Sequence, residues 1–284
     1  MLQRARGAHG IVTGAELRAD GWDRSTVSRA VRAGLLRRVA PSTFAVAALT
    51  DPLTPVAAIQ RHQPTLVLDR RAAAAAWGFD GFRPAAEAAG LRVTTPARTL
   101  VDLCGVPGVD ADQLELALES ALRGGATSYA ELRRRVEAGG SARQVLADAL
   151  ARRRPDAPAT DSYAETRFLQ EVVRPLGLED PDRQVPIFIP GRPEPYRADF
   201  LFRRPLGCLD VEIDGVAFHG PQSGRDDAVR DHFLRTAGVQ TLRLDAERVD
   251  HRPHAVRSTL ARELKLLEHP FDRHGREGEE ANRK

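Results

Sequence analysis

Acidic and apolar residues alternate in one short run of this 284-residue chain, Leu209-Asp210-Val211-Glu212-Ile213-Asp214. Because successive side chains of a strand point to opposite faces of a sheet, the run predicts a strand with its three acids on one face. A second alternating run, residues 196–202, comes just before it and carries Asp199. Paired as a hairpin that turns at residues 205 and 206, the two strands place Asp199 opposite Glu212.

Two carboxylates that face each other across an antiparallel pair need a cation or a shared proton. Their Cβ atoms lie about 4.5–5.5 Å apart, and like charges at that distance are destabilising. A hard divalent cation that takes oxygen ligands, Mg²⁺ or Mn²⁺, is the simplest occupant. We therefore expect Asp199 and Glu212 to hold a metal; the alternatives are a shifted register or two solvated acids.

Two more side chains near this pair are each open to two interpretations. Asp214 faces Arg197 in the same register, so that a cross-strand ion pair competes with a role as metal ligand. His219 follows the end of the strand, where a loop could aim it at the carboxylates as a general base or leave it at the surface.

Helices are predicted on both sides of the hairpin in the sequence. Glu165 belongs to the pattern Ser162-x-x-Glu165, a capping box that explains this acid without chemistry. The later helix carries Asp227, Arg230 and Asp231 three and four residues apart, which is the spacing of intrahelical salt bridges. Helices that flank a mixed sheet predict an α/β domain.

The beginning of the chain is basic, because residues 1–46 hold eight arginines and three acids, a local charge of +5. Such a segment suits the phosphate backbone of nucleic acid. Capping residues and apolar spacing predict two helices followed by two short strands, the order of a winged helix-turn-helix. The second helix and the wing turn small hydroxyls and arginines outward, as a helix in a major groove would, although a solvated helix in an arginine-rich protein is the alternative. The outward residues are Ser25, Thr26, Ser28, Arg29, Arg32, Arg37 and Arg38.

Composition limits the remaining classes. No purely apolar run is longer than that of residues 72–77, which is far shorter than the ~20 residues of a membrane span, and we expect no signal peptide because no hydrophobic segment follows the first residues. The only cysteines, Cys104 and Cys208, form no C-x-x-C pair, so that we expect a cytoplasmic protein without a disulfide scaffold. Lysine occurs only at positions 265 and 284.

The expected fold class is a multidomain combination of α+β and α/β. A charged stretch broken by prolines, residues 152–158, marks the clearest boundary. The expected parts are a winged helix-turn-helix (1–50), a mostly helical scaffold without catalytic residues (51–155), a mixed sheet flanked by helices (156–268) and a polar tail (269–284).

The C-terminal part resembles the very-short-patch-repair endonuclease-like proteins of the PD-(D/E)xK restriction-endonuclease-like superfamily. Glu165 and the pair Gln184-Val185 fall where that family has a helix Glu and a Gln-hydrophobe strand. The strings that carry the resemblance are Tyr196-Arg197-Ala198-Asp199-Phe200, Val211-Glu212-Ile213-Asp214-Gly215 with His219, Asp227-x-x-Arg230-Asp231-x-x-Leu234 and Gly238-x-x-x-Leu242-Arg243.

This resemblance implies metal-dependent hydrolysis of phosphodiester bonds. Asp199 and Glu212 would be the metal ligands and Glu165 a third, outer carboxylate, while Gln184, Asp227 and Arg230 would support the domain. The lysine of the D…(D/E)-x-K pattern is replaced by Asp214. Water would then be activated by His219 or by a second metal on Asp214, unless the domain is inactive.

The N-terminal part is similar to the winged-helix domain of AbiEi-type antitoxins, and residues 93–102 are similar to a motif in the middle region of such proteins. Together the two resemblances cover most of residues 7–265. They favour an endonuclease that a winged helix targets to duplex DNA. The alternative is a repressor or antitoxin-like regulator with a degenerate nuclease-like domain and a partner toxin or regulator protein; the oligomeric state stays open.

Overall fold

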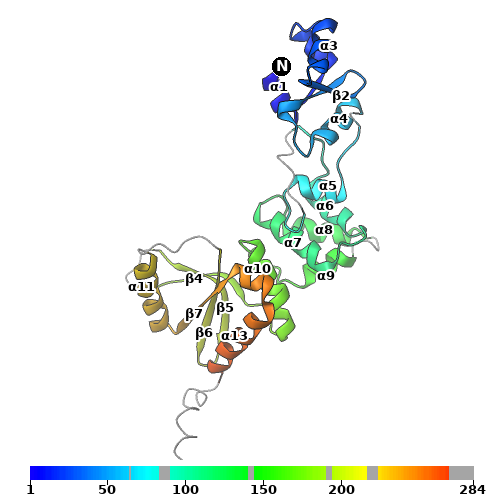
Figure 1. Ribbon diagram of the computed structural model, residues 1–284. Helices are drawn as coiled ribbons and strands as arrows, with labels where there is room; N and C mark the ends of the chain where they lie inside the picture. The colour runs from blue at the N-terminus through cyan, green and yellow to red at the C-terminus, as the bar shows by residue number, and fades with distance from the viewer. Residues whose placement is uncertain (64, 83–89, 140–143, 190–193, 216–222, 269–284) are drawn as a thin grey trace, which may run out of the picture. The chain divides into compact units, whose positions relative to one another are not determined.

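The computed structural model describes residues 1–63, 65–82, 90–139, 144–189, 194–215 and 223–268. The chain divides into two compact units, Met1–Leu150 and Ala151–Lys284. The first appears in blue to green in Figure 1, and the second continues from green to orange. Among the described residues, no helix combines the length and apolarity that a membrane crossing requires.

The first unit begins with a small antiparallel sheet and short helices. Its strand order is β1-β3-β2. Thr13 caps the helix that begins at Gly14 through a capping box with Glu16, and Asp23 caps the helix that begins at Arg24. Apolar residues that include Leu17, Leu36 and Phe44 form the core beneath. The elements are α1 (Leu2–Arg6), β1 (Ile11–Thr13), α2 (Gly14–Ala19), α3 (Arg24–Arg32), β2 (Leu36–Ala40), β3 (Thr43–Val46) and the 3₁₀ turn η1 (Ala47–Leu49).

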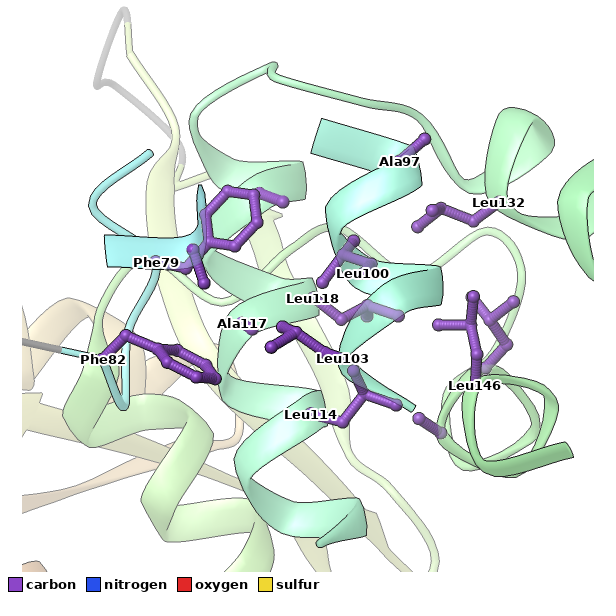
Figure 2. Close-up of a cluster of buried hydrophobic side chains, with 14 residues drawn as sticks. Phe79, Phe82, Ala97, Leu100, Leu103, Leu114, Ala117, Leu118, Leu132 and Leu146 are labelled. Carbon is purple, nitrogen blue, oxygen red and sulfur yellow. The ribbon is translucent and has the colours of Figure 1, made fainter. Parts of the chain in front are cut away.

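The rest of the first unit is helical and has a leucine-rich core of its own. Leu100 and Leu103 from one helix meet Leu114 and Leu118 from the next, and Leu146 closes the cluster, as Figure 2 shows. All five side chains are fully buried. The helices are α4 (Thr54–His62), α5 (Arg70–Ala76), α6 (Pro96–Leu103), α7 (Ala111–Arg123), α8 (Tyr129–Glu137) and α9 (Gln144–Ala151).

The second unit contains a four-stranded mixed sheet in the order β4-β5-β6-β7. β4, β5 and β6 are antiparallel neighbours, whereas β7 runs parallel to β6 and is reached through a crossover helix, as a parallel pair requires. The elements are α10 (Tyr163–Phe168), the π-helical turn η3 (Leu169–Val173), the 3₁₀ turn η4 (Arg174–Leu176), β4 (Asp182–Ile187), β5 (Tyr196–Arg204), β6 (Gly207–Asp214), α11 (Ser223–Thr236), β7 (Val239–Asp245), α12 (Ala246–His251) and α13 (Pro253–Leu266).

The sheet buries both of its faces. One face carries Phe200 and Val211 and packs against Phe168 of α10 and Leu260 of α13. The opposite face is covered by α11, which lies across the sheet from α10 and α13 in Figure 1. The hairpin of β5 and β6 has the predicted register, because Phe200 pairs with Val211 and the chain turns at residues 205 and 206.

The helical core of the first unit generates a stability prediction. Replacing Leu118 by Ala removes a fully buried side chain from α7 and leaves a cavity. We expect the free energy of unfolding to fall by about 2–5 kcal/mol. Leu35→Ala is the matched control in the same unit, because Leu35 is 63% exposed, and it should change stability by less than about 0.5 kcal/mol. Urea unfolding followed by circular dichroism measures both, and equal effects of the two substitutions would contradict the packing described.

Candidate functional site

The predicted carboxylate pair lies where the hairpin of β5 and β6 ends. The ladder of paired residues stops at Phe200 and Val211, one pair short of Asp199 and Glu212. Asp199 instead uses its side chain, because the amide of Ile213 donates a hydrogen bond to its Oδ2 at 3.4 Å. Asp199 and Glu212 therefore come from adjacent strands at the same level of the sheet.

Glu212 is buried and held by two arginines. Arg230 of α11 donates from Nη2 to both carboxylate oxygens, at 2.9 and 2.7 Å. Arg243 of β7 stands beside Glu212 in the parallel register, with its Nε 3.1 Å from Oε2. The cations at this acid are guanidinium groups, which match a carboxylate in charge and in planar geometry. We call these three side chains the Glu212 clasp.

The clasp continues into α11. Arg243 donates from Nη1 and Nη2 to the two oxygens of Asp231, at 3.0 and 2.7 Å. The guanidinium of Arg230 also lies 4.6 Å from the centre of the Tyr196 ring. Arg230 and Asp231 thus reach the sheet in addition to sharing a helix, while the side chain of Asp227 lies outside the described part of the chain.

Glu165 combines its capping role with a place beside the carboxylates. Ser162 caps α10 and donates to Glu165, whose Oε2 also accepts from the amide of Asp161 at 2.8 Å. Burial raises the pKa of Glu165, and the nearby charge of Asp199 adds to this. Gln184 donates from Nε2 to the same Oε2 at 3.2 Å, so that α10 is tied to β4 next to Asp199.

Gln184 has an unusual backbone. Its φ of +52° lies in the left-handed region, which residues other than glycine rarely adopt. Its neighbours Arg183 and Val185 pair with Phe200 and Ala198, which places Gln184 opposite Asp199. Strain of this kind costs roughly 1–3 kcal/mol and persists only where the surroundings enforce it, often at functional sites.

Asp214, another of the expected site residues, is not part of the clasp. Asp214 is exposed at the end of β6, and Arg197 forms its ion pair with Asp161 rather than with Asp214. Asp214 still lies close enough to act on both predicted ligands, because its charge raises the pKa of Asp199 and of Glu212. His219 lies outside the described residues.

Asp210 is a buried acid outside the predicted metal pair. It has no exposed surface, and neither carboxylate oxygen has a hydrogen-bond partner. Burial raises its pKa to about 7, and the charge of Asp199 adds to the shift, whereas the charges of Arg230 and Arg243 oppose it. The signal was present in the alternation, since Asp210 shares the face of Glu212 and precedes it by two residues.

The carboxyls of this face share one electrostatic character. Burial is the largest cause of a raised pKa at Asp199 and at Glu212, and at Glu212 it outweighs the opposing charges of Arg230 and Arg243. Groups whose ionised form is disfavoured in this way either keep a proton or attract a cation. We call Asp199, Asp210 and Glu212 the carboxylate face.

The predicted metal pair does not fit an ion as its side chains stand. Both oxygens of Glu212 are engaged by the clasp. Within the described ranges, no group of three or more His, Cys, Asp or Glu side chains is arranged to hold a metal. A divalent ion shared by Asp199 and Glu212 would therefore require Arg230 to release an oxygen of Glu212.

A second candidate site lies on the N-terminal sheet and α3. The side chains predicted to face outward are exposed there, except that Thr26 is half-buried. Asp23 caps α3, and hydrogen bonds from Thr26 and Ser25 lower its pKa to about 2. Arg29 donates to the hydroxyl of Thr26 at 3.2 Å. The resulting surface is presented by α3 and by β2, and it includes Ser25, Ser28, Arg29, Arg32, Arg37 and Arg38.

The hairpin of β2 and β3 within this surface is anchored in the core. Arg38 lies over the ring of Phe44 at 5.3 Å from its centre, and Phe44 itself is buried in the core beneath. Arg37 and Arg38 pair with Ala45 and Phe44 in the ladder of β2 and β3. The backbone that carries both arginines is therefore fixed by the sheet, while their guanidinium groups stay accessible to a ligand.

Residues 1–47 match the family described as transcriptional regulator, AbiEi antitoxin. The match begins at the first residue and ends directly after β3, so that it covers the small sheet with α1, α2 and α3. No curated protein and no solved structure matches the chain.

The Glu212 clasp generates a prediction about stability. Arg243→Met keeps the aliphatic stem but removes the charge that serves both Glu212 and Asp231. The Arg243 side chain is 32% exposed, so that solvent screens part of its charge. We expect the free energy of unfolding to fall by about 2–3 kcal/mol. Urea unfolding monitored by far-UV circular dichroism measures the difference.

Arg133→Met is the matched control, because Arg133 pairs with Glu137 on the exposed surface of α8. Surface pairs contribute about 0–1 kcal/mol, so that this control should hardly change stability. A loss at Arg243 no larger than at Arg133 would show that the clasp does not hold the sheet and α11 together.

Proposed function

We propose that this protein is a DNA-binding regulator of the antitoxin type, which binds duplex DNA through a winged helix-turn-helix in residues 1–50. The observation that carries the proposal is the agreement of two independent facts. The family match covers residues 1–47, and the same residues build the small sheet and helices that expose a basic surface.

α3 has the properties of a recognition helix. Its exposed side chains are short hydroxyls and arginines, which donate to and accept from base edges in a major groove. Its buried side contributes Ala30 to the core, so that the helix is anchored while its outer side is available. Arg29 is the best candidate for base contact, because an Arg can hydrogen-bond a guanine through two donors.

The strands β2 and β3 have the properties of a wing. They bring Arg37 and Arg38 next to α3, and β2 and α3 pack against each other in the same small core. Two adjacent arginines outside the recognition helix suit phosphate groups, which position a protein on DNA without reading its sequence. The family description also names an antitoxin, so that a toxin is the class of protein partner that accompanies this proposal.

The wing gives a prediction for DNA binding. Replacing both Arg37 and Arg38 by Ala should weaken binding to all duplexes by a similar factor. The log–log dependence of affinity on salt should flatten by up to ~2, because each lost phosphate contact contributes ~0.9 to the slope. Fluorescence anisotropy over a series of salt concentrations measures both effects. The matched control is the double variant Arg133→Ala/Arg135→Ala, which removes two exposed arginines from α8.

The result for Arg29→Ala should differ in kind. This substitution should change the preference among DNA sequences by about 1–3 kcal/mol, if the side chain reaches base edges. An unchanged salt slope in the wing variant would show that Arg37 and Arg38 do not touch the DNA backbone. Equal losses in the wing variant and in the α8 control would contradict the proposed surface.

Hydrolysis of phosphodiester bonds by the second unit is the second candidate function. Its support is the carboxylate face together with the strained backbone of Gln184 opposite Asp199. These features suit a site for a metal ion and a nucleic-acid phosphate, and Mg²⁺ or Mn²⁺ is the cofactor that the proposal requires. The engagement of Glu212 by Arg230 stands against it, which makes this the weaker candidate.

A nicking assay separates the two candidates. With an active nuclease, supercoiled plasmid should be nicked in Mg²⁺ or Mn²⁺, excess chelator should stop the reaction, and Glu212→Ala should reduce the rate by at least ~10²-fold. If the unaltered protein binds its DNA but leaves the plasmid intact in both metals, the nuclease candidate is abandoned and the regulator remains. Nicking that persists in chelator would instead contradict a metal-dependent mechanism.

A further inference from the structure

The interior of the second unit contains polar atoms that lack partners. Both carboxylate oxygens of Asp210 and the hydroxyl of Thr241 are buried and form no hydrogen bond. Asp210 and Thr241 are aligned in the parallel register of β6 and β7, so that their side chains lie side by side on the face covered by α11. Groups of this kind are rare in native proteins, and each one calls for a bound water, an ion or a proton.

Asp199 joins these two groups from the adjoining strand. Leu201 of β5 pairs with Asp210, and Asp199 precedes Leu201 by two residues, so that Asp199 and Asp210 are diagonal neighbours on one face of the sheet. The charge of Asp199 also raises the pKa of Asp210. Asp199 itself accepts only a long hydrogen bond, from the amide of Ile213 at 3.4 Å. The oxygens of Asp199 and Asp210 and the hydroxyl of Thr241 therefore offer lone pairs that the protein itself leaves almost unused.

We infer that a hard divalent cation binds beneath α11 between Asp199 and Asp210, with the hydroxyl of Thr241 as a further oxygen ligand. The acid that the nuclease resemblance supplies as the second ligand, Glu212, is not part of this site. It is already satisfied by two guanidinium groups, whereas Asp210 has none in contact.

The chemistry of the three groups suits such an ion. Mg²⁺ and Mn²⁺ take oxygen ligands, and Mg²⁺ is commonly held by one or two carboxylates while it keeps several waters. Two carboxylates and one hydroxyl supply that minimum. The inference does not depend on DNA binding by residues 1–50, so that either one can fail without the other.

The test measures metal binding by the full chain and needs no catalytic readout. Mn²⁺ is titrated into chelator-treated protein, and free Mn²⁺ is followed by electron paramagnetic resonance, with the melting temperature in Mg²⁺ or Mn²⁺ as a second measurement. Asp210→Asn should weaken Mn²⁺ binding by at least about tenfold, while Glu212→Gln should leave it within about threefold. Asp199→Asn should abolish Mn²⁺ binding whether the second ligand is Asp210 or Glu212. The control is Glu137→Gln on the exposed surface of α8, which should leave Mn²⁺ binding unchanged.

Thr241→Val supplies a second, nearly isosteric variant in case Asp210→Asn does not fold, and it should weaken Mn²⁺ binding while leaving the clasp intact. Loss of binding in Glu212→Gln with normal binding in Asp210→Asn would place the ion at Asp199 and Glu212 and overturn the inference. Absence of Mn²⁺ binding by the unaltered protein would also overturn it, because Asp210 would then hold a proton or a water.

Discussion

Glu212 and the two arginines that hold it organise the second unit. A glutamate that is almost completely buried in a central strand is tolerated only if its charge is compensated, because an isolated buried charge is very costly. Arg230 supplies compensation from α11 and Arg243 from β7, so that one carboxylate connects the strand, the crossover helix and the parallel strand that follows it. Asp231 then closes the network back onto Arg243. The crossover helix is therefore positioned by charge as well as by the apolar contacts of Leu234.

The same network explains why the carboxylate face is unusual. Guanidinium groups satisfy Glu212 but form no hydrogen bond with Asp210, although both acids lie on one strand and one face. Burial disfavours the ionised form of each acid, and neighbouring acids add to this effect. Acids in such a place either keep a proton or attract a cation. The first unit has the opposite character, because its small sheet and α3 present exposed arginines on a well-packed base.

Much of the local structure followed from short-range signals in the chain. The caps at Thr13 and Ser162, the alternation of residues 209–214 and the turn at residues 205 and 206 each act within a few residues, and the structure confirms all of them. The hairpin register could be predicted because a tight turn leaves one way to place the apolar residues of both strands on the same face. The strand β1 lacked such a signal, since its three residues gain their partners only from β3, thirty residues later.

The sequence by itself determined which residues share a face, where helices begin and that the first residues are basic, because these properties depend on side-chain periodicity and local capping. It could not decide which cation meets which acid. Arg230 and Arg243 lie 18 and 31 positions after Glu212, and Arg197 forms its ion pair with Asp161 rather than with Asp214. Partners of this kind are selected by the packing of α10 and α11 on the sheet. Only the tertiary structure, through burial, showed that Asp210 is the acid left without a partner, because desolvation is a property of the folded interior and not of the neighbouring residues in the chain.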